Sequence, residues 1–445
     1  MVVIILNYGP TLSSVQKDLS LIESEKVILV SVKNSDDELF YYKLNEMKSL
    51  CEACNFEISE TIYQTLDKPN VKTYIGSGKL KEIKAICDMS ETEIVVFAGE
   101  LTPSQIKNIN EVLTDIEVID RTMLILQIFA KRANSKIGQL QVEIARAKYM
   151  LPRLIGSRDY LSRVGGGTSS GATNRGAGET KLELDRRYLE NKVNQLKKEL
   201  EYYKQQRQTT RKLRNEAEAK KIAFVGYTNA GKSSTINSLL ALYGEDKKEL
   251  FVKDMLFATL ETQTRKIKLP NNHEFLITDT IGFVSDLPHH LIESFKSTLE
   301  EILEADIIVH IVDASSPFKD RQMATTLSVL ESIGVKEIPI ITVFNKCDLV
   351  KNNYVLTDYI DSERISAKFK EGIRTMIEKI DEITFGESFI DTFLIPFSDS
   401  KFVNLLKTTS DVYDLSFNEQ GTIIRAKVSL KIHQMLEKYI MKNQD

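Results

Sequence analysis

The segment IAFVGYTNAGKS, residues 222–233, contains the pattern G-x-x-x-x-G-K-S between Gly226 and Ser233. It follows the apolar run Ile222–Val225 and precedes the helix-like stretch Ser234–Leu242. A strand, a glycine loop and a helix in this order bind phosphate, because the glycines let backbone N–H groups converge on phosphate oxygens beside the helix N-terminus. We expect a nucleotide to contact Gly226, Tyr227, Thr228, Asn229, Ala230, Gly231, Lys232, Ser233 and Ser234.

Three further motifs follow apolar runs, at the carboxyl ends of strands where ligands bind in open α/β sheets. They are Asp279-Thr-Ile-Gly282, Asn345-Lys346-Cys-Asp348 and Ser366-Ala367-Lys368. The Asp348 carboxylate can accept hydrogen bonds from both donors on the guanine edge, and adenine offers a mismatched edge, so GTP is favoured over ATP. Lys346 can lie over the base, Asn345 can brace its loop, and the backbone of residues 366–368 can meet the guanine oxygen.

The remaining motif residues are expected to contact Mg²⁺ or the terminal phosphate of the nucleotide. Lys232 is expected to reach the β- and γ-phosphates, and the Ser233 hydroxyl to bind Mg²⁺. Asp279 is expected to hold the same ion through water, and the Gly282 N–H to meet the γ-phosphate. These residues, in this order, predict a GTP-hydrolysing domain over residues 221–384.

Two positions near the γ-phosphate are less regular. We choose Thr259 as the switch threonine on Mg²⁺ and the γ-phosphate, with Thr262 and Thr264 as substitutes and an ordinary strand threonine as the structural explanation. Phe283 follows Gly282, where many small GTPases have a glutamine that orients water. Because phenylalanine cannot do so, we expect slow hydrolysis by the protein alone, or hydrolysis assisted by another group.

Residues 121–220 predict a basic helical-hairpin linker. Residues 122–151 are expected to form one long helix that Pro152 interrupts, and residues 179–218 a second with leucines every seven residues. The two would pack as an antiparallel coiled coil, joined by a Gly/Arg loop at 153–178. Residues 131–220 hold 21 Lys and Arg against 10 Asp and Glu, although the whole chain carries −4.

This local positive charge indicates contact with a polyanion, or alternatively a solvated hairpin with a lysine-rich face. The loop is suited to probing a nucleic acid, or else is a linker between domains. Four loop arginines are the candidate RNA contacts: Arg153, Arg158, Arg163 and Arg175.

The sequences at the two ends of the chain predict two smaller domains. Residues 1–120 alternate β-branched runs, starting at Val2–Leu6, with helix-like stretches, which indicates an α/β domain. Residues 385–445 predict a small α+β domain. With 445 residues, four cysteines and no apolar run of membrane-spanning length, the chain is expected to be a cytoplasmic, monomeric protein without stable membrane insertion.

The chain resembles the HflX family of ribosome-associated GTPases over nearly its whole length. The most specific segments lie in the linker: Arg121–Ala130, Gln139–Glu143, Leu151–Leu154 and Gly176–Arg187. Segments Gly226–Ser234, Phe257–Leu260 and Asp279–Phe283 match the nucleotide motifs. The sequence departs from the family pattern at Gln127, at Ala177, in the long loop 165–179 and in residues 261–264.

The resemblance implies that GTP favours binding to the large ribosomal subunit and its rRNA, that stalled or stressed ribosomes are split, and that hydrolysis to GDP, stimulated by the ribosome, resets the cycle. It also implies partial membrane association through ribosomes. A ribosome assembly or hibernation factor is the main alternative. A GTPase that serves an RNA-modifying enzyme, or a switch for a protein effector, remains open.

Overall fold

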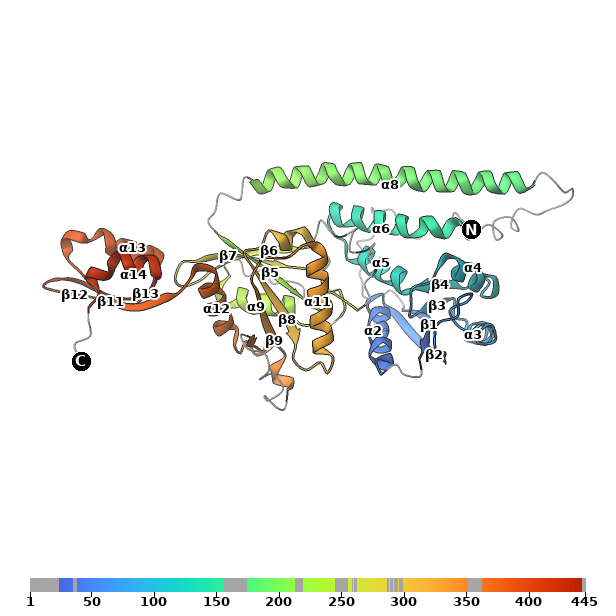
Figure 1. Ribbon diagram of the computed structural model, residues 1–445, viewed down its shortest axis with the longest axis horizontal. Helices are drawn as coiled ribbons and strands as arrows, with labels where there is room; N and C mark the ends of the chain where they lie inside the picture. The colour runs from blue at the N-terminus through green and yellow to red at the C-terminus, as the bar shows by residue number, and fades with distance from the viewer. Residues whose placement is uncertain are drawn as a thin grey trace.

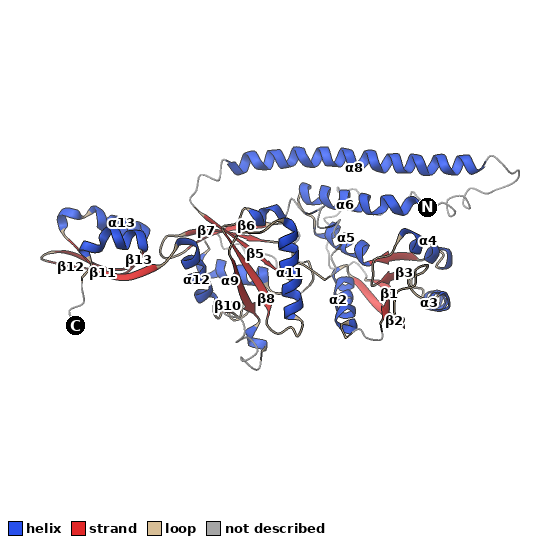
Figure 2. Cartoon of the chain, in the orientation of Figure 1, coloured by secondary structure: helices blue, strands red, loops and turns tan. Residues whose placement is uncertain are grey.

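The computed structural model describes residues 24–34, 38–155, 174–212, 219–244, 255–257, 259, 262–285, 288, 291, 295, 299–350 and 362–441. The strands in these ranges form three separate sheets, each with its own helices (Figure 2). The predicted strand Val2–Leu6 lies outside the described residues. The predicted fold class, a set of α/β and α+β units with a mostly parallel central sheet, is confirmed.

The first sheet is parallel, in the order β2-β1-β3-β4. Its elements are β1 Glu25–Lys33, α2 Phe40–Ala53, β2 Phe56–Thr65, α3 Ser77–Ser90, β3 Ile94–Phe97, α4 Pro103–Val112 and β4 Glu117–Asp120. Alternate residues of β1 enter two cores, Val27 and Leu29 with α2, Ile28 and Val30 with α3 and α4. Helix α4 begins with a capping box between Thr102 and Gln105.

The second sheet has the order β10-β9-β8-β5-β7-β6, with only β6 antiparallel to its neighbour. Its elements are β5 Lys220–Gly226, α9 Lys232–Tyr243, β6 Gln263–Lys268, β7 Glu274–Asp279, β8 Ile307–Asp313, α11 Lys319–Ile333, β9 Ile340–Asn345, η1 Cys347–Leu349, β10 Ser362–Arg364 and α12 Ile373–Phe385. Helices α9 and α12 cover one face and α11 the other, so the sheet is doubly wound.

The linker differs from its prediction in two ways. The expected single helix over 122–151 is wrong, because α5 (Arg121–Arg132) ends before α6 (Lys136–Ile155) begins. Ser135 starts the second helix by accepting a hydrogen bond from Gly138 N at 3.1 Å, as capping serines do. Pro152 does not interrupt α6, which runs on to Ile155.

Helix α8 (Asn174–Lys212) begins five residues before the expected start at Glu179. Its Leu196 and Leu200 pack against Leu140 and Ile144 of α6. Ion pairs Lys136–Glu199 (3.1 Å) and Lys192–Glu143 (2.7 Å) run in opposite sequence directions, so the two helices are antiparallel.

The third sheet is antiparallel, in the order β11-β13-β12. Its elements are β11 Ser388–Ile395, η3 Phe397–Asp399, α13 Lys401–Thr409, β12 Asp411–Asn418, β13 Gly421–Ser429, α14 Leu430–Leu436 and η4 Glu437–Tyr439. A separate core under α13 and α14 holds this unit together.

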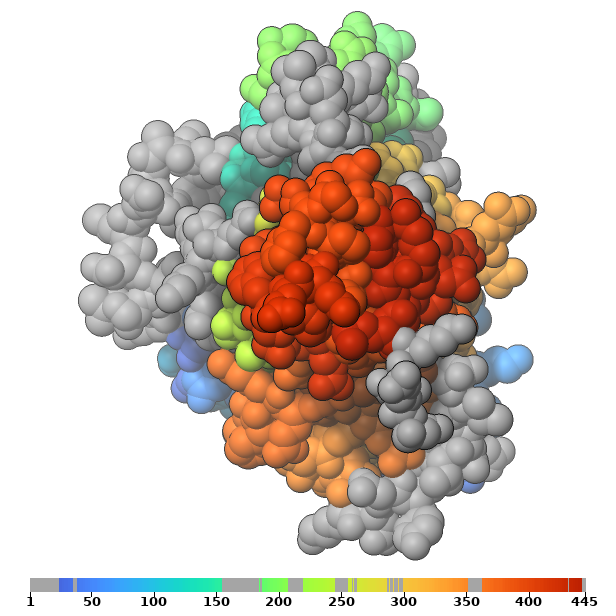
Figure 3. Space-filling view, turned by 90° about the vertical axis from the view of Figure 1, so that its left-hand side faces the viewer, coloured from blue at the N-terminus to red at the C-terminus, as the bar shows by residue number. Residues whose placement is uncertain are grey.

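The three sheets lie in a row, with α8 running above the first and second sheets (Figure 1). Seen from one end, residues of the third sheet form a rounded lobe in front of the second (Figure 3). None of the helices in the described ranges is long and apolar enough to cross a membrane.

Candidate functional site

The phosphate-binding loop joins the end of β5 to the start of α9. Gly231 has φ 94°, and a Cβ there would lie 2.1 Å from Asn345 Nδ2, so only glycine fits. That same Nδ2 donates to Ala230 O at 2.9 Å. The loop therefore has the tight, amide-lined shape that the motif predicts, with residues 226–234 contiguous in it.

Lys232 lies at the centre of this loop and is buried. Its Nζ donates to Gly226 O at 3.1 Å and to Tyr227 O at 3.0 Å. Burial lowers the pKa of Lys232 to about 8, while Asp279 opposes the shift. A bound phosphate would raise this pKa again, because the anion would favour the charged form of the lysine.

The three predicted magnesium ligands lie together. Ser233 Oγ donates to Asp279 Oδ2 at 2.6 Å, Thr259 Oγ1 donates to the same oxygen at 3.0 Å, and the two hydroxyls are 3.1 Å apart. Asp279 Oδ1 is buried and has no hydrogen-bond partner among the described residues. Burial raises the pKa of Asp279, and a cation would offset that effect. Two hydroxyls and a carboxylate with a spare oxygen fit Mg²⁺, which prefers oxygen ligands.

The base-recognition residues also converge. Asn345 Oδ1 accepts from Ala367 N at 3.0 Å, so this buried side chain joins the two base loops and the phosphate loop. Ser366 Oγ donates to Asp348 Oδ1 at 2.6 Å, and Lys346 Nζ lies 2.9 Å from Asp313 Oδ2. Lys368 is exposed beside these residues.

Asp313 was missed in the sequence, although it also follows an apolar strand, β8. Its place at the carboxyl end of a parallel strand could have identified Asp313, because the base-recognition motifs were identified from the same position.

The Phe283 side chain is directed into the protein core. It is buried in the core that α11 covers, together with Val225, Leu299 and Ile302. Its backbone lies along the phosphate loop: Phe283 N donates to Gly226 O at 3.2 Å and its O accepts from Thr228 N at 2.7 Å. Phe283 is therefore a packing residue that fixes Gly282 beside the loop.

Tyr227 has partners that no motif indicated. Its hydroxyl donates to Glu46 Oε2 at 2.5 Å and lies 2.6 Å from Ser285 Oγ. Glu46 in turn pairs with Arg121. Burial, with the charge of Glu46, raises the pKa of Tyr227 above its usual range, so the hydroxyl stays protonated. Helices α2 and α5 thus contribute side chains that meet the phosphate loop.

The Arg153 guanidinium is buried against protein groups in this structure and is not exposed for contact with RNA. Its side chain is only 9% exposed, donates to Leu101 O and Tyr149 O at 2.8 Å each, and lies over the Tyr149 ring. It also lies 3.6 Å from the buried Asp120 carboxylate. The expectation of RNA contact at this position is therefore corrected to a structural role. Arg158 and Arg163, and the Arg175 side chain, lie outside the described residues.

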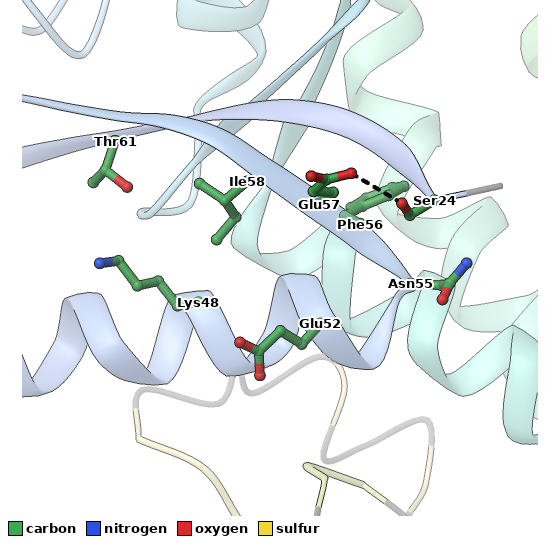
Figure 4. Close-up of a pocket in the computed structure, with 8 residues that line it drawn as sticks. All are labelled: Ser24, Lys48, Glu52, Asn55, Phe56, Glu57, Ile58 and Thr61. Carbon is green, nitrogen blue, oxygen red and sulfur yellow. Dashed lines mark hydrogen bonds between the residues drawn. The ribbon is translucent and has the colours of Figure 1, made fainter.

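A hollow of about 560 Å³ lies between α2 and β2 (Figure 4). Lys48 and Glu52 project from the helix, and Glu57 accepts a hydrogen bond from Ser24 at 3.1 Å. Its acidic side chains, Glu52 and Glu57, do not suit a phosphate. Nearby, burial raises the pKa of both Cys51 and Cys54 to about 12, which leaves these thiols protonated.

We expect the protein to become less stable as the pH falls from about 6.5 to 4. Burial, with the charge of Lys232, lowers the pKa of His310 from 6.5 to about 4. In this interval the unfolded chain binds a proton at His310 and the folded chain does not, so stability is lost on acidification, by roughly 3 kcal/mol in all. Urea midpoints at pH 7 and 4.5 measure this loss. This loss of stability should be smaller in His310→Leu than in the wild type. It should be unchanged in the control His433→Leu, because the His433 side chain is more exposed. Equal losses in the two variants would exclude His310 as the cause.

Relatives that are similar to this chain over most of its length share one family name. Residues 41–130 match the model described as "GTP-binding GTPase N-terminal", residues 132–214 "GTP-binding GTPase Middle Region" and residues 221–346 "50S ribosome-binding GTPase". A protein named GTPase HflX from Caldanaerobacter subterraneus subsp. tengcongensis is 40% identical over 94% of each chain. The Escherichia coli K12 GTPase HflX is 34% identical over 84% of this chain and 86% of its own. The crystal structure of a GTP-binding protein from Sulfolobus solfataricus with GDP covers 81% of this chain and 98% of its own, at 25% identity and TM-score 0.45.

Proposed function

The chain belongs to the HflX family of GTPases, and from this membership we propose that its GTP cycle controls binding to the large ribosomal subunit and splitting of stalled ribosomes. GTP hydrolysis to GDP and phosphate is the reaction of this family. We infer that the GTP-bound form binds the subunit, and that hydrolysis releases it.

We assign the site residues to this reaction as follows. Lys232, Thr259 and Gly282 contact the γ-phosphate, and Ser233, Thr259 and Asp279 hold Mg²⁺. Asp348, braced by Ser366, selects guanine. The convergence of a carboxylate and two hydroxyls beside a buried lysine is the observation that supports this assignment most directly.

We propose that the basic hairpin makes the RNA contact. The family model matched by residues 221–346 is described as ribosome-binding, and the adjoining residues 131–220 hold 21 basic against 10 acidic residues. The four-part division at residues 120, 220 and 384, a monomeric state and a cytoplasmic location, with partial membrane association through ribosomes, belong to the same proposal. A ribosome assembly or hibernation factor is the second candidate, because the same basic hairpin would serve it.

Replacing Arg158, Arg163 and Arg175 with alanine is expected to weaken ribosome binding by about 10-fold or more, because each lost phosphate contact lowers affinity and its salt dependence. Co-sedimentation with purified ribosomes at two salt concentrations measures this, and GTP affinity should not change. Arg374→Ala is the control, since this exposed arginine pairs only locally with Glu378. Unchanged sedimentation would remove the loop from the proposal.

Splitting is tested by sucrose gradients of whole ribosomes with the protein and GTP, GDP or a non-hydrolysable GTP analogue. A shift to free subunits that requires GTP or the analogue supports splitting. Binding without a shift favours the assembly or hibernation factor instead.

A further inference from the structure

A buried polar cluster connects the first sheet to the phosphate loop of the second. It consists of Glu46 on α2, Arg121 at the start of α5, Tyr227 and Ser285, and is called the Glu46 cluster below. Arg121 Nη2 donates to Glu46 Oε1 and, at 2.8 Å, to Ser285 O. The side chains of Arg121 and Glu46 are 9% and 5% exposed.

Tyr227 is the centre of this cluster. Its hydroxyl donates to Glu46 Oε2 at 2.5 Å and accepts from Ser285 N at 2.6 Å. Apolar contacts surround the cluster, since Phe129 of α5 packs edge-on against Phe257 and Phe295. Charges and hydrogen bonds in such a dry setting are strong, and removing one partner is costly.

The cluster fixes the segment that carries Gly282. Ser285 is three residues after Gly282, and Phe283 between them is bonded on both sides to the phosphate loop. Gly282 therefore lies very close to Lys232: a Cβ there would be 3.0 Å from Lys232 Nζ and 2.9 Å from Thr228 Cα.

The short distance between Gly282 and Lys232 affects whether the site accepts GTP or GDP. Under the proposed function, the γ-phosphate lies between Lys232 Nζ and the Gly282 N–H. Gly282 must move away from Lys232 to admit it, whereas GDP has no γ-phosphate and requires no such movement. Any contact that holds Ser285 in place therefore opposes GTP more than GDP.

We propose that Glu46 and Arg121 are positioning residues that hold Gly282 against Lys232 and so set the preference of the site for GDP over GTP. The inference rests on the proposed function. When the γ-phosphate displaces Gly282, Ser285 and Tyr227 shift with it. Their contacts with Glu46 and Arg121 transmit this shift to α2 and α5. The unit built on the first sheet thereby responds to the bound nucleotide through the Glu46 carboxylate and the Arg121 guanidinium.

The test uses the double variant Glu46→Leu/Arg121→Met of the full chain, which removes both charges at once and leaves neither buried alone. Glu46→Gln, which removes one charge and keeps the length of the side chain, is a second variant in case the first does not fold. Gln322→Ala is the control: Gln322 Nε2 donates to Tyr42 OH at 3.2 Å, also between the first and second sheets, but outside the cluster.

Calorimetry with Mg²⁺ measures the affinities for GDP and for the β,γ-imido analogue of GTP. In both cluster variants, the affinity for the analogue should rise about 10-fold relative to GDP, within the range of known couplings between sites. GDP affinity should stay within about twofold, and Gln322→Ala should match the wild type.

An unchanged ratio of the two affinities in the folded variants would overturn the proposal, as would a parallel change in both. Absence of guanine nucleotide binding by the wild-type protein would instead refute the proposed function, so the two failures are distinguishable.

Discussion

Replacing Lys232 with methionine is expected to lower kcat/KM for GTP by about 10³-fold, the effect of removing a central charge from a preorganised phosphate site. Methionine has a similar length and is apolar, so the buried position stays filled. The loop carbonyls of Gly226 and Tyr227 lose their donor but lie beside a loop whose shape Gly231 and Asn345 also hold. Stability should therefore change less than activity.

Phosphate release in the presence of Mg²⁺ measures this effect. Lys221→Met is the matched control, because Lys221 lies on β5, which leads into the loop, but is partly exposed and pairs with Glu304 at 3.2 Å. Activity of the Lys232 variant within about 10-fold of the wild type would contradict the site assigned here.

The second large effect concerns the base. Asp348→Asn is expected to lower GTP affinity by roughly 10³-fold, because the amide cannot accept both guanine hydrogen bonds and turns a donor toward the guanine amine. Xanthine carries a carbonyl in place of that amine, so the variant should bind XTP better than GTP. Ser366 Oγ, now 2.6 Å from Asp348 Oδ1, can still donate to the asparagine oxygen, which keeps the new side chain in place.

Competition between labelled GTP and unlabelled XTP measures this exchange. The reciprocal change is its own control, because a misfolded variant would lose both nucleotides. A variant that still prefers GTP would show that another residue selects the base.

The sequence predicted the features that depend on local chemistry. The glycine loop and the motifs after β7 and β9 each lie within a few residues, so their order along the chain was sufficient. Central strands of the parallel sheets such as β3 and β8, which are buried on both faces, were also recognisable as apolar runs.

Features made by distant residues or by weakly patterned segments were not predictable. β6, with the sequence QTRKIK, and β12, with DVYDLSFN, are edge strands whose exposed charges hide the apolar alternation. Glu46 and Ser285 are 75 and 164 residues from Arg121, and no spacing rule connects them. Arg153 was assigned by its charge, whereas Asp120 and Tyr149 decide its position.

The unequal lengths of the two antiparallel helices have a mechanical consequence. At 1.5 Å per residue, the 39 residues of α8 span roughly 58 Å and the 20 residues of α6 only about 30 Å. The longer helix therefore extends well beyond α6, and a rotation of about 6° about one end of α8 would displace the other end by roughly 6 Å. Because only a few residues separate α8 from β5, a modest rearrangement around the nucleotide could be amplified to the scale of an RNA groove.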